Sequence, residues 1–167
     1  GCIPTKALAH TADVMEAAGH AAELGLVIPE VRLDFARVMA RKDKVVAKLR
    51  GGVGLLLKRR KVDVFTGVGT LAGTRAVEAT APDGSTTRIE ARNIVIATGS
   101  EPVAPRMFGY DGVNMLTSDD VLKLKELPES VLIVGAGVIG CEFAGIFRTF
   151  GCEVTMVDIM PNILPMV

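Results

Sequence analysis

The sequence predicts an α/β fold made of two consecutive units, the first of which carries an inserted small antiparallel sheet. Three observations predict it. The first part of the chain has helical composition and spacing, the middle alternates like antiparallel strands, and the last part is typical of a strand, a Gly-rich turn, a helix and a strand; these parts are residues 4–61, 62–97 and 131–158. The proline-punctuated stretch EPVAPRMFG favours a boundary between the units at residues 105 and 106.

Two helices are predicted before the sheet. Residues 4–24 are rich in Ala, Leu, Met and Glu, and Pro4 suits a first helical turn, where its missing N–H has no partner to lose. Asp34 is the expected N-cap of a longer helix that ends near Lys61 and is weakened in its middle by glycines.

The second helix carries most of the positive charge. Ten of the 19 Lys and Arg residues lie between Arg37 and Lys61, although the whole chain has a formal net charge of zero. This stretch contains no aromatic residue that could stack on a base, and its apolar residues recur at helical spacing. The pattern therefore predicts a solvated basic face and no nucleic-acid partner.

Residues 62–97 contain the short alternating stretches VDVFTG, RAVEATAP and TTRIEARN, with PDGS at 82–85 as a hairpin turn. NIVIATG follows and predicts a buried strand. Ser118 or Asp119 is then expected to cap a short helix that ends near Leu127.

Composition excludes several classes of protein. No apolar run approaches the ~18–20 residues of a membrane span, so we expect a soluble, cytoplasmic protein without a membrane partner. The three cysteines, Cys2, Cys141 and Cys152, are too scattered for a disulfide framework or a zinc site, so no metal site is expected. Cys141 and Cys152 are assigned to packing.

The Gly-rich turn predicts a nucleotide site. Gly135-x-Gly137-x-x-Gly140 follows an apolar strand and opens a helix, where the glycines allow a tight turn, approach of a pyrophosphate and close helix packing. The predicted binding residues are Gly135, Ala136, Gly137, Val138, Ile139 and Gly140. A similar pattern beginning at Gly67 is followed by strand-like alternation, so it lacks the helix N-terminus that holds phosphate.

Asp158 favours NAD over NADP. It stands 23 residues after Gly135, at the end of the second strand, where a carboxylate can accept hydrogen bonds from both adenosine ribose hydroxyls. NADP would place a phosphate beside this carboxylate, and no basic residue follows Arg148 to offset the repulsion.

Cys2 is the candidate reactive thiol. A cysteine at a helix start is often a small packing residue, but the free N–H groups of the first turn and Lys6 would both stabilise a thiolate there.

These motifs together resemble a known family. GCIPTK is similar to the second half of the redox-active C-x-x-x-x-C-x-P-[ST]-K signature of the pyridine nucleotide-disulfide oxidoreductases, IVIATGS resembles their flavin-contacting strand end, and VGAGVIGCEFA resembles their NAD turn. The resemblance covers the whole chain. It implies two Rossmann-like dinucleotide-binding domains, FAD over residues 1–105 and NAD over 106–167, both incomplete, with a β-meander inserted in the first.

The resemblance also implies roles for single residues. Cys2 would lie against the flavin ring, Lys6 near the flavin N5 and Glu142 near the nicotinamide. Asp158 stands where glutamate is usual in the family. The residues implied as further FAD contacts are Gly69, Thr98, Gly99 and Ser100.

The implied activity passes electrons from a dithiol through a redox-active disulfide and FAD to NAD. Members that oxidise dihydrolipoamide are the most similar, which implies a homodimer whose substrate is carried on a lipoyl domain of a 2-oxo acid dehydrogenase complex. Members that reduce mercuric ions or glutathione disulfide, and a non-catalytic dinucleotide-binding module, remain alternatives.

Several family features are expected outside the 167 residues, namely the partner cysteine five positions before Cys2, the flavin pyrophosphate turn and the proton-relay histidine. The segment alone is therefore expected to be inactive, and His10 and His20 are expected to be surface or packing residues. Within the segment, we expect an ion pair between Lys6 and Glu142, partly shielded from water, where the two domains meet.

Overall fold

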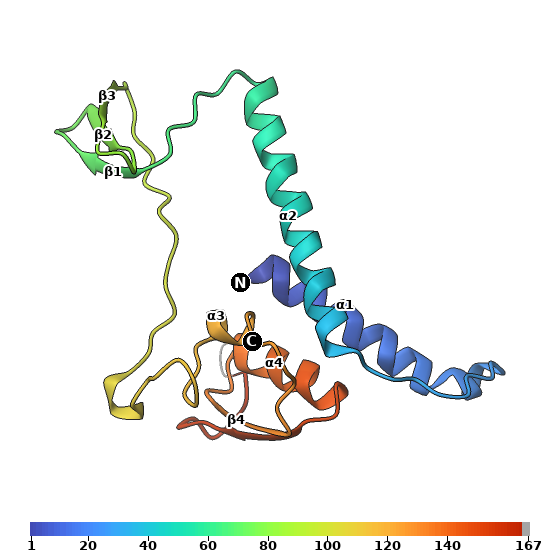
Figure 1. Ribbon diagram of the computed structural model, residues 1–167. Coiled ribbons are helices and arrows are strands. Elements are labelled where there is room, and N and C mark those ends of the chain that lie inside the picture. Colours follow the sequence, from blue (N-terminus) through green and yellow to red (C-terminus); the bar gives the residue numbers. More distant parts are fainter. Residues whose placement is uncertain (165–167) are drawn as a thin grey trace. The chain divides into compact units, whose positions relative to one another are not determined.

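The structure, a computed structural model, describes residues 1–164 (Figure 1). It separates into two compact units, one made of residues 1–49 and 102–167 and the other of residues 50–101. These units are defined by packing within the chain. The division at residues 105 and 106, which concerns the two cofactors, stays a prediction.

The first predicted helix is confirmed. Helix α1 spans Cys2–Gly19 and is followed by the 3-10 helix η1, Ala21–Leu24, which ends at Gly25 in a left-handed conformation with φ 75°. Pro4 lies in the first turn, where the amide and hydroxyl of Thr5 both donate to the carbonyl oxygen of Gly1.

The second helix is also confirmed. Helix α2 spans Phe35–Arg59, and the Asp34 carboxylate accepts a hydrogen bond of 3.0 Å from the backbone N–H of Arg37, as an N-cap does. The three internal glycines do not break the helix. The basic face is exposed except at Lys42, whose side chain is buried and bonds the carbonyl oxygen of Leu122 and the carboxylate of Asp43.

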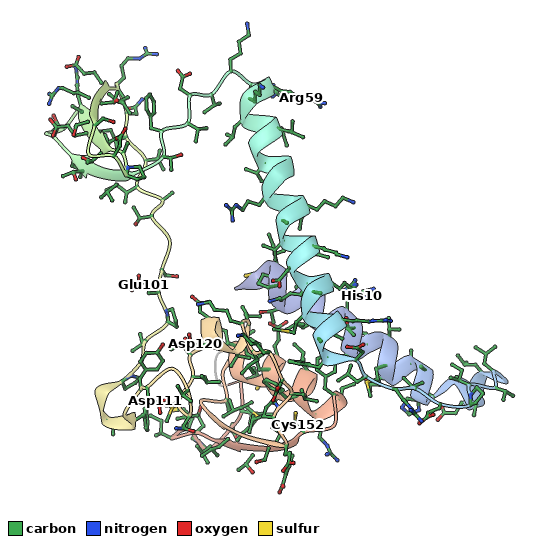
Figure 2. All side chains as sticks on the ribbon, viewed as in Figure 1. His10, Arg59, Glu101, Asp111, Asp120 and Cys152 are labelled. Carbon is green, nitrogen blue, oxygen red and sulfur yellow. The ribbon has the colours of Figure 1, made fainter. Side chains whose placement is uncertain are left out.

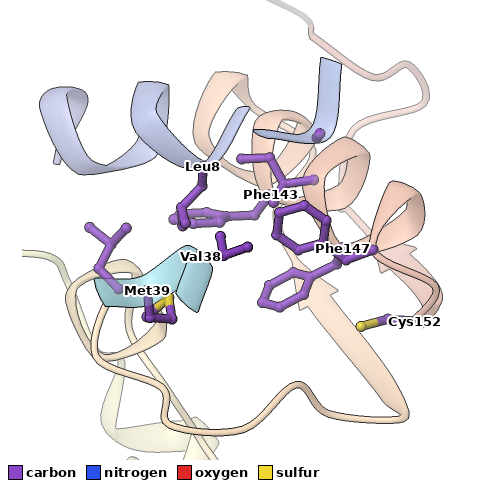
Figure 3. Packing of buried hydrophobic residues seen from close by; sticks show 10 residues of the cluster. Leu8, Val38, Met39, Phe143, Phe147 and Cys152 are labelled. Atoms are coloured by element: carbon purple, nitrogen blue, oxygen red, sulfur yellow. The ribbon is translucent and has the colours of Figure 1, made fainter. Parts of the chain in front are cut away.

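The core of the first unit is formed by three helices and a parallel strand pair. Strands β4 (Ser130–Val134) and β5 (Glu153–Val157) pair in register and are connected by helix α4 (Val138–Thr149). Figure 3 shows α1 and α2 packing on α4 through apolar side chains, which include Leu8, Val38, Met39, Phe143, Phe147 and Cys152.

The packing roles of the two later cysteines are confirmed. Cys152 is 1% exposed and its thiol donates to the carbonyl oxygen of Pro128 at 3.0 Å, while burial raises the pKa of this thiol. Cys141 is half-buried on α4, and its thiol donates to the carbonyl oxygen of Ala136.

The second unit contains the predicted antiparallel meander. Strands β1 (Val68–Leu71), β2 (Ala76–Thr80) and β3 (Thr86–Glu90) lie in the order β1-β2-β3. The predicted turn at residues 82–85 closes with a hydrogen bond of 2.8 Å from the Ala81 amide to the Ser85 carbonyl oxygen. The sheet is smaller than predicted, because residues 62–67 form no strand.

The prediction of a buried strand after the meander was wrong. Residues 93–97 are not a buried strand: no strand of the described residues pairs with them, and Val95 and Ile96 are 86% and 70% exposed. An apolar run becomes a buried parallel strand only where neighbouring strands and covering helices exist.

The short helix before β4 is capped one or two residues earlier than predicted, and it ends at Val121 instead of near Leu127. Helix α3 spans Ser118–Val121, and its N-cap is Thr117. Thr117 and Asp120 form a reciprocal capping box, in which the Asp120 carboxylate accepts from the Thr117 amide and hydroxyl, so the cap is set by this pair.

Among the described residues, no helix is long and apolar enough to cross a membrane.

Candidate functional site

The Gly-rich turn between β4 and α4 has the geometry that its glycines predict. Gly135 has φ 109°, a left-handed conformation that favours glycine, and its amide donates to the Val157 carbonyl oxygen at 2.8 Å. A Cβ atom at Gly140 would overlap the Gly135 carbonyl oxygen, so the third glycine is required for α4 to pack against the turn. A Cβ atom at Gly137 would meet no described atom within 4 Å, which leaves this backbone open to a ligand.

Helix α4 presents free amides beside this opening. It begins at Val138 after Gly137, and within residues 1–164 no side chain caps its N-terminus by a hydrogen bond. The first N–H groups of a helix lack intrahelical acceptors, and with the helix dipole they favour an anion. A pyrophosphate therefore fits the turn on the chemistry of the groups present.

The structure places the Asp158 carboxylate against this turn. Its two oxygens accept hydrogen bonds from the backbone amides of Ala136 at 2.5 Å and Met160 at 2.7 Å. These donors hold the pKa of the Asp158 carboxyl below its usual range, the Ala136 amide having the largest effect. Asp158 is thus ionised at neutral pH and fixed in position near the predicted pyrophosphate site.

Cys2 and Lys6 occupy one end of α1. Cys2 is the first residue of the helix and is exposed, and Lys6 lies one turn further on. The Lys6 ammonium bonds the Glu142 carboxylate, so the predicted ion pair between α1 and α4 is confirmed. The hydrogen bond and charge of Glu142 raise the pKa of Lys6, and Cys2 and Asp13 add smaller effects.

The ion pair is less shielded than expected. In the structure, the Lys6 side chain is 70% exposed and that of Glu142 31%. Exposure to water weakens the attraction between two charges. The pair therefore contributes little to the stability of the fold, but it shows that the Lys6 and Glu142 side chains face each other.

The predicted FAD contacts Gly69, Thr98, Gly99 and Ser100 belong to the second unit. Gly69 lies within β1, and Gly99 has φ 81°, a left-handed conformation. As expected, the pattern that begins at Gly67 continues as a strand and opens no helix. The contacts of these residues with a flavin stay a prediction.

Both histidines are surface residues, as expected. Figure 2 labels His10 on α1, where it is exposed, and the exposed His20 pairs with Glu23 at 2.9 Å. Within the part of the chain that the structure describes, no cluster of His, Cys, Asp and Glu could hold a metal ion.

Sequence reasoning missed the role of the segment after β5. The Leu164 amide donates to the Ala136 carbonyl oxygen at 2.9 Å, so both polar backbone groups of Ala136 are bonded to residues that follow β5. Since the bond from Leu164 is made by a backbone amide, no residue pattern in 159–164 could have indicated it.

Comparison with known proteins supports this arrangement. The chain is 42% identical over 165 residues to a dihydrolipoyl dehydrogenase of Chlorobaculum parvum, covering 99% of this chain and 35% of that protein. It is 41% identical over 176 residues to a dihydrolipoyl dehydrogenase of Bacillus subtilis, covering 99% of this chain and 36% of that protein. The chain thus spans about a third of the length of these relatives.

Solved structures show the same fold. The crystal structure of LpdA from Mycobacterium tuberculosis matches with a TM-score of 0.89 and 28% identity, covering 99% of this chain and 36% of that one. A Cu(II) complex of the flavoprotein disulfide reductase RclA from Escherichia coli matches with a TM-score of 0.77 and 32% identity, covering 99% and 34%. The predicted α/β, dinucleotide-binding fold is confirmed.

The sequence profile of the family described as pyridine nucleotide-disulphide oxidoreductase matches residues 1–167. The profile therefore covers the thiol, the Lys6–Glu142 pair and the Gly-rich turn together. The chain belongs to the pyridine nucleotide-disulphide oxidoreductase family.

Proposed function

We propose that the protein containing this chain is a dihydrolipoamide dehydrogenase-type flavoprotein, which passes electrons from a dithiol through a redox-active disulfide and FAD to NAD. The observation that carries the proposal is the Lys6–Glu142 ion pair. It joins the helix that begins with the candidate thiol Cys2 to the helix that begins at the nucleotide turn.

The geometry of the Gly-rich turn supports an NAD site, and the family resemblance supplies the proposed flavin contacts. The turn from Gly135 to Gly140 and the N-terminus of α4 would hold the NAD pyrophosphate, and Asp158 would accept from the adenosine ribose hydroxyls. Cys2 and Lys6 would face the flavin, with Gly69, Thr98, Gly99 and Ser100 as its further contacts. When bound, FAD supplies a two-electron acceptor for thiols and NAD supplies a hydride acceptor.

The thiol step involves Cys2 and a partner cysteine of the same protein. A dihydrolipoamide thiolate attacks their disulfide and forms a mixed disulfide, and its second thiolate then displaces the attacked cysteine. The new disulfide joins the two sulfur atoms of lipoamide, which is released. Cys2 and its partner cysteine are left reduced, as thiolates that carry the two electrons. The Lys6 ammonium lies within one turn of Cys2 and would offset the negative charge of its thiolate.

The cellular setting follows from the same proposal. We propose a cytoplasmic homodimer that receives its substrate from a lipoyl domain of a 2-oxo acid dehydrogenase complex. Support comes from the resemblance of GCIPTKAL and the Gly-rich turn to members that oxidise dihydrolipoamide, and from the names of the relatives.

The test uses the full-length protein loaded with FAD. We expect dihydrolipoamide to reduce NAD, and we expect Cys2→Ser to abolish this reaction while NADH oxidation by an artificial acceptor persists, because that reaction bypasses the thiols. His10→Gln is the matched control, since His10 is exposed on the same helix.

Three outcomes would contradict the proposal. Full activity of Cys2→Ser would remove the thiol from the reaction. Reduction of mercuric ions or glutathione disulfide without dihydrolipoamide oxidation would assign the protein to another member of the family, and no redox reaction with any of them would support a non-catalytic module.

A further inference from the structure

The second unit has a hollow of about 500 Å³ at the end of the meander where β1 turns into β2. Small-molecule sites commonly measure about 300 to about 1,000 Å³. Three alanines line it, and the polar side chains around it are Thr74, Arg75, Arg88, Glu90 and Arg92. None of the residues proposed to hold FAD or NAD lines this hollow.

Backbone hydrogen bonds bring the turn that contains Arg75 beside the end of β3, where Arg88 and Arg92 lie on and just after the strand. The Ala72 amide donates to the Ala76 carbonyl oxygen at 2.9 Å and closes the turn that contains Arg75. The Ala91 amide donates to the Arg75 carbonyl oxygen at 2.9 Å, which fixes Arg75 beside the residues that follow β3. Arg88 lies on β3 itself, directly opposite Glu78.

The charges around the hollow are not balanced. Arg88 pairs with Glu78 at 3.3 Å and with Glu90 at 3.7 Å, so its charge is already offset. Arg75 and Arg92 are exposed and form no ion pair within residues 1–164. The lining therefore holds three guanidinium groups and one carboxylate.

We propose that this hollow binds a small phosphorylated molecule, through the guanidinium groups of Arg75 and Arg92. Guanidinium groups bind phosphate oxygens by paired hydrogen bonds, and the Thr74 hydroxyl adds a further donor. The alanine side chains that line the hollow are small, so they leave room for the rest of the ligand. This site is separate from the redox site and does not depend on the proposed function.

Isothermal titration of the full-length, FAD-loaded protein with inorganic pyrophosphate tests the proposal, with NAD present at saturation so that the Gly135 turn is already occupied. We expect saturable binding that Arg75→Ala with Arg92→Ala weakens by at least about tenfold, the size of one lost charge-assisted interaction. Arg59→Ala with Arg60→Ala is the matched control, because it removes the same charge from exposed positions of the same unit and should leave the affinity unchanged.

Two further variants sharpen the test. Glu90→Gln removes the one carboxylate of the lining and should tighten pyrophosphate binding. Arg75→Lys keeps the charge but loses the paired donors, so it should bind more weakly than the wild type.

Three results would overturn the site: no pyrophosphate binding at millimolar concentration, equal losses in the hollow and control variants, or no tightening in Glu90→Gln. A titration with glucose 6-phosphate then separates the possible sources of the phosphate. Binding of both probes with the same sensitivity to Arg75 and Arg92 supports an organic phosphate as the ligand, whereas binding of pyrophosphate alone would exclude it.

Discussion

At the scale of single residues, Asp158 shows how a backbone can fix the position of a charge. Its two oxygens are held by the amides of Ala136 and Met160, so the carboxylate belongs to the nucleotide turn as well as to the end of β5. The family resemblance implies glutamate at this position, and aspartate shortens the side chain by one methylene. The contact with Ala136 shows that the shorter side chain still reaches the turn.

Asp158→Asn should weaken the preference for NAD. The amide oxygen can still accept from Ala136, but the negative charge that repels the 2′-phosphate of NADP is removed. We expect kcat/KM for NAD to fall and that for NADP to rise in the full-length enzyme, measured with both cofactors. Glu153→Gln, at an exposed position of β5, should change neither value, and a wild-type preference for NADP would contradict the assignment.

Asp111 should make the folded protein lose stability as the pH falls into the acid range. Its carboxylate accepts from the amides of Val113, Asn114 and Met115 at 2.8 to 2.9 Å, and these bonds, led by that of Met115, hold its pKa far below the ordinary 3.8. Because the folded pKa is depressed, this contribution to stability is present above pH ~4 and is lost as the pH falls further. Figure 2 labels Asp111 and the neighbouring capping residue Asp120.

Asp111→Asn should therefore lower the melting temperature at pH 7, with a difference from the wild type that shrinks below pH ~4. Thermal unfolding at several pH values measures this difference. Asp119→Asn is exposed in the same unit and should show no such pattern, and a difference that grows towards low pH would refute the role of Asp111.

At the scale of elements, the β4-turn-α4 unit depends on the absence of one side chain. Gly140→Ala places a methyl group on the Gly135 carbonyl oxygen, so α4 must move away from the turn. Overpacking of this kind typically costs about 1–3 kcal/mol, and the displaced amides should also weaken NAD binding.

Gly145→Ala is the matched control in the same helix. A Cβ atom there would meet no described atom within 4 Å, so the substitution should raise helix stability by about 0.5–1 kcal/mol and leave NAD binding unchanged. Thermal unfolding and NAD titration of both variants check the prediction. Equal melting temperatures of Gly140→Ala and Gly145→Ala would contradict the steric role of Gly140.

Local sequence signals predicted the elements whose determinants lie within a few residues. Asp34 caps α2, residues 82–85 form a hairpin turn, and the three glycines predicted the nucleotide turn, because each signal acts through neighbouring backbone groups. Residues 93–97 could not be predicted in this way, since an apolar run pairs as a strand only if other strands lie beside it. The predicted cap of α3 was Ser118 or Asp119, both good caps, and the sequence prediction missed Thr117, which its reciprocal pair with Asp120 makes the cap.

The candidate site was predictable where chemistry restricts the residue type. The Lys6–Glu142 pair joins residues 136 positions apart, and the resemblance placed both beside the cofactors, so their meeting could be expected. Their exposure could not, because it depends on all the surrounding side chains. Lys42 was missed for the same reason: nothing near it in the sequence distinguishes it from the solvated lysines of α2, and the Leu122 carbonyl that binds it lies 80 positions away.

At the scale of the whole molecule, the first unit joins residues from opposite ends of the chain. Arg41 donates to the Ala7 carbonyl oxygen at 2.9 Å, Lys42 bonds Leu122, and Lys6 bonds Glu142. The candidate thiol and the nucleotide turn are therefore held in one body by helices that are distant in sequence. Arg41 and Lys42 bond backbone carbonyl oxygens, whereas Lys6 bonds the charged side chain of Glu142, and both residues of this pair belong to the proposed site.

Lys6→Met should slow electron transfer much more than it affects folding or NAD binding. An exposed ion pair contributes little to stability, so the melting temperature should change little. The family resemblance puts the ammonium near the flavin N5, so its loss should slow flavin reduction by dihydrolipoamide in stopped-flow measurements and leave the KM for NAD near its wild-type value.

Three comparisons make this prediction specific to the site. Lys6→Arg should restore part of the rate because it keeps the charge, and Lys48→Met, at an exposed position of α2, should have no effect. The pKa of Lys6 is raised above 10.5, so the group stays charged throughout the pH range of assay and the loss should be the same from about pH 6 to about pH 9. An unchanged rate of flavin reduction in Lys6→Met would show that the charge serves only to pair α1 with α4, and the functional role of Lys6 would then be wrong.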